Sequence, residues 1–455
     1  MKQTRREFIK TSSAALAVGL GGIGMAAETR KPNLIVIYCD DLGYGDLSCF
    51  GSKEIRTPHL DALAKDGVRF TDWYSNCPVC SPSRASLLTG RYPQRAGVTH
   101  ILGGKRGTPG LPGDQVTLAK ALKPLGYRTA LFGKWHLGLT KECRPNAHGF
   151  DEFHGFLAGC VDYYSHIFYW GMGGKQGNPT HDLWHNETEV WDNGRYLTEV
   201  ITEKSVEFIK DKHDEPFFLY TAYNAPHYPM HAPKKYLDRY PDLPPDKRIM
   251  AAMISAVDDG VGEIVQELKR TGQYENTAIF FSSDNGPSTE SRNWLDGTED
   301  LYYGGSAGVF RGHKGSLFEG GIRMPAILSC PGAIPSGQVC DKPGMMMDIF
   351  PTYLEMAGGQ AASIDGTSIL PMVTKGAPSP HEQLLWAHDG QLAVRQGKWK
   401  LVLDGKLDFL RTQPDAVHLS DLESDPGERT NLADKEPAVA KELTGAVKSW
   451  AASLK

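Results

Sequence analysis

Apolar runs alternate with segments of helical periodicity over the first three-quarters of the chain. Runs rich in β-branched and aromatic residues predict buried strands over residues 34–38, 68–74, 128–132, 217–220, 277–281 and 325–328. Apolar positions spaced three and four apart predict helices over residues 58–66 (with Thr57 as N-cap), 117–125, 197–209, 246–270 and 348–357. This alternation favours an α/β domain with a large, mostly parallel sheet that helices cover on both faces.

The pattern changes after about residue 375. Residues 391–394 and 399–403 predict antiparallel strands joined at Gln396-Gly397, residues 417–419 a third strand, and residues 437–454 a closing helix. We therefore expect one domain over residues 30–375 and a small C-terminal α+β subdomain with an antiparallel sheet over residues 376–455.

Composition and the N-terminus narrow the class of protein. The 455 residues are 40% hydrophobic and 23% charged with a net charge of −5, and no basic stripe is visible, so nucleic acid is not an expected partner. Residues 4–10 contain a twin-arginine motif, and the apolar stretch at 14–25 is too short to span a bilayer. Residues 1–26 are therefore predicted to be a signal peptide that directs export through the twin-arginine machinery, to the periplasm or beyond, without a stable membrane span.

Two acidic segments follow predicted strands. Asp40 and Asp41 come after residues 34–38, and Asp284-Asn285 comes just after residues 277–281. Ligands of open α/β sheets bind outside the carboxyl ends of the strands, and carboxylate and amide oxygens suit Ca²⁺ or Mg²⁺. Each segment alone could equally be a solvated or Asx turn. Their placement at the ends of strands predicted to be neighbours favours one shared ion.

Basic groups follow other strands or stand between glycines. Lys134 and His136 come after residues 128–132, His227 after 217–220, and Lys314 lies next to Gly315. The alternative is an exposed lysine or a packed histidine at each position. Together they predict a cationic pocket for an anion.

The segment Cys80-Ser81-Pro82-Ser83-Arg84, continued by residues 88–91, is the most specific motif. It is suited to a reactive group at the start of a helix with a cation beside it. Taken alone, Cys80 could instead be a structural thiol or pair with Cys77. Among the eight cysteines, Cys330 and Cys340 flank a Pro/Gly-rich turn and are the best candidate disulfide.

These segments, in this order and spacing, resemble the type I, formylglycine-dependent sulfatases, which are arylsulfatase-like members of the alkaline-phosphatase-like superfamily. The resemblance extends from about residue 30 to the C-terminus, where residues 425–428 and 431–432 also match. It implies the alkaline-phosphatase-like fold and oxidation of Cys80 to formylglycine by a maturation enzyme. It also implies a divalent cation, usually calcium with magnesium possible, held by Asp40, Asp41, Cys80, Asp284 and Asn285.

The resemblance further assigns residues to catalysis. Arg84 would orient residue 80, and a sulfate pocket would be lined by Lys134, His136, His227 and Lys314. The family's additional polar contact to the sulfate has no clear counterpart, and Ser165 and His166 are the candidates for it. Trp294, with Asn293 and Tyr302, is a candidate to line the pocket from the other side.

Sulfate ester chemistry explains why such a site is suitable. A metal and several cations stabilise charge on the sulfuryl and leaving oxygens. A hydrated aldehyde at residue 80 would attack sulfur with one hydroxyl and expel sulfate with the other, whereas a plain thiol or hydroxyl would remain sulfated. Asp284 is expected to act as base for the attacking hydroxyl, His227 with Lys314 to protonate the leaving oxygen, and His136 to take the proton during elimination.

The substrate is expected to be a sulfated carbohydrate, with aryl sulfates also turned over. Residues 162–191 contain seven aromatic side chains whose faces could stack on sugar rings: Tyr163, Tyr164, Phe168, Tyr169, Trp170, Trp184 and Trp191. Core packing is the alternative for at least half of them. Two other functions stay open: a phosphomonoester or phosphonate hydrolase of the same fold, and a secreted glycan-binding protein that has lost catalysis.

Overall fold

The computed structural model describes residues 30–169, 179–211, 214–290, 304–409, 411–412 and 415–454. Pro32–Lys455 forms one compact unit, separate from Met1–Lys31. The predicted signal peptide at 1–26 lies outside the described residues. Among those described, no helix combines the length and the apolar character that crossing a bilayer requires.

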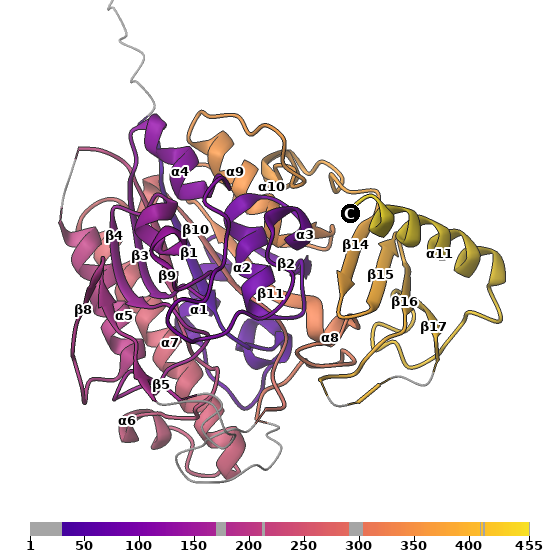
Figure 1. The fold of residues 1–455 in the computed structure, drawn as a ribbon, viewed down its shortest axis with the longest axis horizontal. Coiled ribbons are helices and arrows are strands. Elements are labelled where there is room, and N and C mark those ends of the chain that lie inside the picture. Colours follow the sequence, from indigo (N-terminus) through magenta and orange to yellow (C-terminus); the bar gives the residue numbers. More distant parts are fainter. Residues whose placement is uncertain are drawn as a thin grey trace, which may run out of the picture. The chain divides into compact units, whose positions relative to one another are not determined.

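The large sheet of this unit is mixed and mostly parallel, as predicted (Figure 1). Its strand order among the described residues is β12-β2-β11-β10-β1-β9-β3-β4-β7-β8, with β13 paired to β2. Strands β10, β1, β9, β3 and β4 are parallel to one another, while β11 runs antiparallel to both β10 and β2. The bounds are β1 (Asn33–Cys39), β2 (Val68–Tyr74), β3 (Arg128–Lys134), β4 (Glu152–Phe156), β7 (Trp184–His185), β8 (Thr188–Glu189), β9 (Phe217–Ala222), β10 (Thr277–Ser283), β11 (Arg323–Ser329), β12 (Gln338–Cys340) and β13 (Gly344–Met345).

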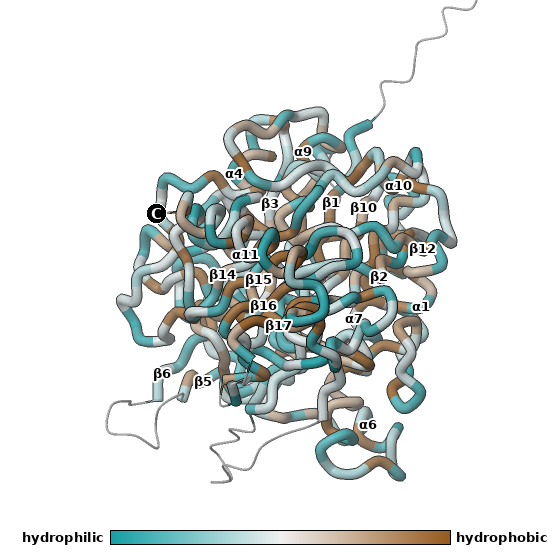
Figure 2. The backbone as a smooth tube through the Cα atoms, turned by 90° about the vertical axis from the view of Figure 1, so that its right-hand side faces the viewer, coloured by the Kyte–Doolittle hydropathy of each residue, from teal (hydrophilic) through white to brown (hydrophobic). Residues whose placement is uncertain are grey.

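Helices cover both faces of this sheet because its central strand is apolar on both sides. In β1, Ile35 and Ile37 pack in one core with α1, α5 and α7, whereas Leu34 and Val36 pack in another with α2, α4 and α9. These helices are α1 (Pro58–Lys65), α2 (Cys80–Thr89), α4 (Leu118–Leu122), α5 (Leu197–Lys210), α7 (Pro245–Arg270) and α9 (Ile349–Met356). Figure 2 shows hydrophobic colour along the interior strands.

An antiparallel sheet lies in the C-terminal subdomain, as predicted, and among the described residues it has four strands where three were expected. Its strands are β14 (Leu384–His388), β15 (Gln391–Gln396), β16 (Trp399–Leu403) and β17 (Val417–Asp421), in that order. Helix α11 (Pro437–Ala452) packs on one face through Leu443 and Val447, while Trp386 and Val402 pack with Phe318 of the large domain. The first strand, β14, was not predicted, and the boundary near residue 375 stays a prediction.

The predicted disulfide between Cys330 and Cys340 is wrong, because all eight cysteines are free thiols. Cys330 directly follows β11 and Cys340 ends β12, but β2 lies between these two strands. Two strand spacings of about 4.8 Å each exceed the roughly 7 Å that a disulfide allows between Cα atoms.

Candidate active site

Cys80 is the first residue of α2, at the end of the short connection from β2. Pro82 lies in the first turn, where its missing N–H leaves no hydrogen bond unmade, and Gly90 ends the helix in the left-handed conformation at φ 66°. Cys80 is 2% exposed, and burial raises the pKa of its thiol to about 11, even though Lys134 and Lys314 lower it. The unmodified thiol is therefore protonated at neutral pH, and a protonated thiol is a poor nucleophile.

The two predicted acidic segments meet because β1 and β10 are parallel neighbours whose last residues, Cys39 and Ser283, are in register. Asn285 Nδ2 donates to Asp41 Oδ1 at 2.7 Å, and the Asp41 amide donates to Asp284 Oδ1 at 3.2 Å. Asp40, Cys80 and Asp284 each offer a ligand atom within 4.8 Å of the others. The residues predicted to share an ion therefore do lie together.

The donor set of this cluster fits a hard divalent cation. The buried atoms Asp40 Oδ1 and Asn285 Oδ1 have no hydrogen-bond partner within the part of the chain that the structure describes. Burial, which removes the charged form from water, raises the pKa of Asp41 to about 7 and that of Asp284 to about 6, and the neighbouring carboxylates add to the shift. Oxygen atoms that lack a partner, in a crowded group of acids, are what Ca²⁺ or Mg²⁺ would satisfy.

Three buried cations surround these acids. Arg84 donates through Nε and Nη2 to Asp284 Oδ2, at 3.0 and 2.8 Å. Lys134 Nζ donates to Asp40 Oδ2 at 2.5 Å, and Lys314 Nζ donates to Asp41 Oδ2 at 2.9 Å. Three carboxylates thus face three cations, so a bound divalent ion would leave excess positive charge, which suits an anionic ligand.

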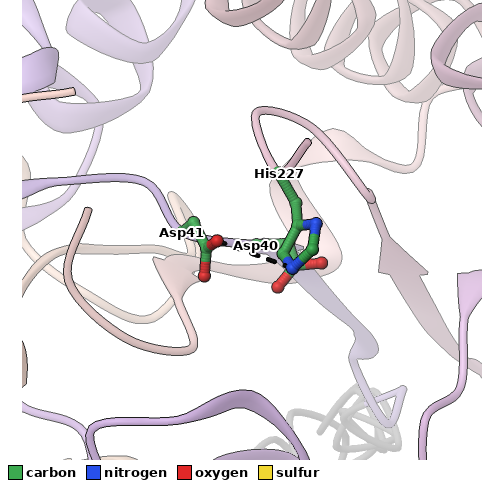
Figure 3. Close-up of side chains that lie close together, drawn as sticks. All are labelled: Asp40, Asp41 and His227. Atoms are coloured by element: carbon green, nitrogen blue, oxygen red, sulfur yellow. Dashed lines mark ion pairs between the residues drawn. The ribbon is translucent and has the colours of Figure 1, made fainter. Parts of the chain in front are cut away.

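The two predicted histidines lie beside this cluster. His227 Nε2 is 3.6 Å from Asp41 Oδ2, a contact that Figure 3 marks with a dashed line. The Nδ1 atom of His227 lies 2.7 Å from the Tyr228 carbonyl. His136 Nε2 lies 3.0 Å from the Leu102 carbonyl, and its backbone has a φ of 53°. Burial first, and then neighbouring lysines, hold the pKa of both imidazoles well below 6.5. Both rings are therefore neutral at pH 7.

A cavity of about 190 Å³ opens over these groups. It is lined by Cys80, Ile101, Leu102, Gly103, Gly104, His136, Gly159, Cys160, Phe168, His227, Tyr228, Glu290 and Lys314. Sequence reasoning missed Glu290 and the backbone of 102–104. Glu290 Oε2 lies 3.6 Å from Lys314 Nζ. The sequence feature that could have identified Glu290 is its position a few residues after Asp284-Asn285.

Several predicted pocket residues lie elsewhere. Ser165 Oγ donates to Asp162, and His166 Nε2 lies 3.2 Å from the Arg195 carbonyl; neither is among the described residues that line the cavity. Of the predicted aromatic residues, Phe168 lines the cavity, whereas Tyr163 is core and Trp191 stacks on His181. The predictions on Trp170, Asn293, Trp294 and Tyr302 lie outside the described residues.

Two family models match the chain. The sulfatase model matches residues 32–359, and the model of the C-terminal region of N-sulphoglucosamine sulphohydrolase matches residues 305–451. The chain belongs to the sulfatase family. It is an enzyme of the class that hydrolyses sulfate esters of sulfated glycans or aryl sulfates.

Individual relatives agree with this assignment. The chain is 34% identical to arylsulfatase J of Mus musculus, covering 92% of this chain and 75% of the relative. It is 33% identical to N-acetylgalactosamine-6-sulfatase of Homo sapiens, covering 83% and 73%. Among solved structures, Ps i-CgsB in complex with a neocarrahexaose superposes with a TM-score of 0.81 at 33% identity, covering 92% of this chain and 93% of that one. The PsFucS1 sulfatase from Pseudoalteromonas sp. superposes with a TM-score of 0.77 at 28% identity, covering 93% and 91%.

Proposed function

We propose that the enzyme removes sulfate from a sulfated carbohydrate, with formylglycine made from Cys80 and a bound calcium ion. The observation that carries this proposal is the convergence of Asp40, Cys80 and Asp284 within 4.8 Å, ringed by buried cations. Asp40, Asp41, Asp284, Asn285 and residue 80 would hold the ion, which supplies charge stabilisation for the sulfuryl oxygens. Formylglycine would supply a nucleophile whose hydrated form can release sulfate.

Each nearby side chain then has a distinct task. Arg84 holds Asp284, the proposed base for the attacking hydroxyl, in place. Lys134 and Lys314 bind the sulfate oxygens when these displace them from their carboxylate partners. His227, which lines the cavity with Lys314, gives a proton to the leaving oxygen, and His136, another lining residue, takes the proton of the elimination step. An incoming anion favours the imidazolium form that His227 needs.

Carbohydrate is the preferred substrate because the cavity combines cations with an apolar wall. Phe168 and Tyr228 line it together with polar groups, a combination that suits a sugar ring. The relatives point the same way, since one is an N-acetylgalactosamine-6-sulfatase and another is in complex with a neocarrahexaose. Aryl sulfates, whose leaving groups are better, would also be cleaved.

Export and maturation complete the proposal. The twin-arginine motif at 4–10 supports export of the folded enzyme to the periplasm or beyond, after a maturation enzyme has modified Cys80.

The test compares 4-nitrophenyl sulfate with 4-nitrophenyl phosphate, using enzyme that has been co-expressed with a maturation enzyme and supplied with calcium. We expect multiple turnover of the sulfate, much slower turnover of the phosphate, and loss of multiple turnover in Cys80→Ser. Preference for the phosphate would favour the phosphomonoesterase alternative. Unchanged turnover by Cys80→Ser would refute the proposed nucleophile.

A further inference from the structure

A second, larger cavity adjoins the catalytic one. It has a volume of about 760 Å³ and lies between residues 94–101 of the large domain and the β14–β15 hairpin of the C-terminal subdomain. Ile101 lines both cavities, so they meet at this side chain. The catalytic cavity is therefore adjacent to a groove that both domains build.

Phe409 provides a second link between the two cavities. Its ring lines the groove, and it lies so close to Gly315 that a Cβ atom added there would be 3.2 Å from it. Gly315 directly follows Lys314, which lines the catalytic cavity. Ile101 and Phe409 are 42% and 40% exposed, and both line the groove, so they give it an exposed apolar surface.

Polar groups surround this apolar surface. His100, Thr99 and Asp389 line the groove, and Gln94 contributes an Oε1 atom that is buried without a hydrogen-bond partner among the described residues. Apolar side chains bordered by hydrogen-bonding groups suit a saccharide, whose ring faces are apolar and whose hydroxyls donate and accept. A donor hydroxyl would satisfy Gln94.

The two volumes indicate how a substrate is divided between the cavities. Ligand sites typically measure roughly 300–1,000 Å³, so the catalytic cavity at about 190 Å³ is small for more than the sulfate and part of one sugar. The groove at about 760 Å³ falls within that range. The groove thus has room for the sugar residues that the catalytic cavity cannot hold.

We propose that the groove between residues 94–101, the β14–β15 hairpin and Phe409 binds the sugar residues adjoining the sulfated one, so that the enzyme prefers oligosaccharides to single sugars. This inference rests on the proposed function, because it takes the sulfate to be bound beside Cys80. The groove would contribute affinity without taking part in the chemical step.

Binding measurements on a Cys80→Ala protein test the groove without turnover. Calorimetric titrations in calcium buffer would compare disaccharides, tetrasaccharides and hexasaccharides from chondroitin 6-sulfate, ι-carrageenan and heparin. In at least one series we expect the tetrasaccharide to bind roughly tenfold more tightly than the disaccharide. Phe409→Ala and His100→Ala should each reduce that ratio by roughly threefold or more. Val339→Ala, at another exposed apolar side chain, should preserve it.

Three results would overturn the proposal. The first is equal affinity for short and long oligosaccharides in every series. The second is a preference for the longer oligosaccharide that remains in both groove variants, Phe409→Ala and His100→Ala. The third is light scattering that shows a second copy of the chain closing the groove. Failure of the proposed function is distinguishable, because hydrolysis of 4-nitrophenyl sulfate by the unmutated enzyme needs the catalytic cavity alone.

Discussion

Arg84 and Asp284, which are 200 residues apart in sequence, form a fully buried ion pair in which Nε and Nη2 of Arg84 donate to the same carboxylate oxygen, at 3.0 and 2.8 Å. The pair joins α2, which carries Cys80, to the end of β10. It leaves Asp284 Oδ1 to accept from the Asp41 amide. One contact thus sets the relative positions of the proposed nucleophile and of both acidic segments.

Arg84→Lys should lower kcat by about 10²–10³-fold and stability by roughly 2–4 kcal/mol, because lysine cannot make the two-pronged contact and leaves a buried carboxylate poorly paired. Steady-state kinetics with 4-nitrophenyl sulfate and urea denaturation measure these effects. Arg91→Lys is the matched control, since Arg91 makes an exposed bond to the Ser363 carbonyl. Equal effects in the two variants would contradict the role given to Arg84.

Lys400 holds two buried carboxylates at the contact between the domains. Its Nζ lies 2.8 Å from Glu319 Oε1 and 3.2 Å from Glu428 Oε1, and all three side chains are inaccessible to solvent. Glu428 also accepts the amide of Glu319, the first residue of α8 (Glu319–Ile322). Lys400→Met should lower the free energy of unfolding by roughly 3–5 kcal/mol, because it leaves Glu428 without its cation and leaves Glu319 with Arg323 alone.

Urea denaturation of Lys400→Met, with Lys398→Met as control, tests this expectation. Lys398 pairs with Asp421 at 2.6 Å but is 40% exposed, so its replacement should cost less than about 1 kcal/mol. Similar losses of unfolding free energy in the two variants would contradict this expectation, because the buried ion pairs of Lys400 would then stabilise the fold no more than the exposed pair of Lys398.

Calcium should raise the melting temperature, because an ion that binds only the folded state stabilises it by mass action. Asp41→Asn should abolish most of this shift, since it removes a proposed ligand charge. Asp259→Asn is the control, because Asp259 lies with His59 and Asp258 in a second group of possible ligands. Differential scanning calorimetry, with EDTA as the metal-free reference, decides which group binds the ion. A shift lost only in Asp259→Asn would move the cation to that other group.

The unmodified thiol of Cys80 should alkylate slowly at neutral pH. Its pKa is raised to about 11 by burial, so the reactive thiolate increases about tenfold with each pH unit up to that value. Protein made without a maturation enzyme would be treated with iodoacetamide and EDTA, and the peptide containing Cys80 quantified by mass spectrometry. The urea-unfolded chain, with an ordinary thiol pKa near about 8.5, is the reference. A folded-state rate that levels off below pH 9 would contradict the buried environment.

The site residues near strand ends were predictable because their residue types suit metal or anion binding and because each stands near the end of an apolar run. Asp40 and Asp284 directly follow β1 and β10, Lys134 ends β3, and His227 comes shortly after β9; parallel strands bring such positions to one edge. The wall formed by the backbone of residues 102–104 was not predictable, since carbonyl and amide groups carry no residue-type signal. Strand β14 was missed because a five-residue apolar run has no period that separates strand from helix.

Contacts between residues that are far apart in sequence also could not be predicted from local sequence patterns. Thr57 was predicted as the N-cap of α1, but its side chain makes no capping bond. Asp258 of α7 accepts the amides of His59 and Leu60 instead, at 3.2 and 2.8 Å. The helix begins where predicted, yet a residue about 200 positions away satisfies its first amides, and no local signal could identify that residue.

The mass of the peptide containing Cys80, measured on enzyme that turns over 4-nitrophenyl sulfate, is the most direct test of the proposed chemistry. We predict the lower mass of the aldehyde, or of its hydrate, in a fraction that rises in proportion to specific activity across preparations. An intact thiol at residue 80 in fully active enzyme would contradict the formylglycine mechanism, whatever the family of the protein.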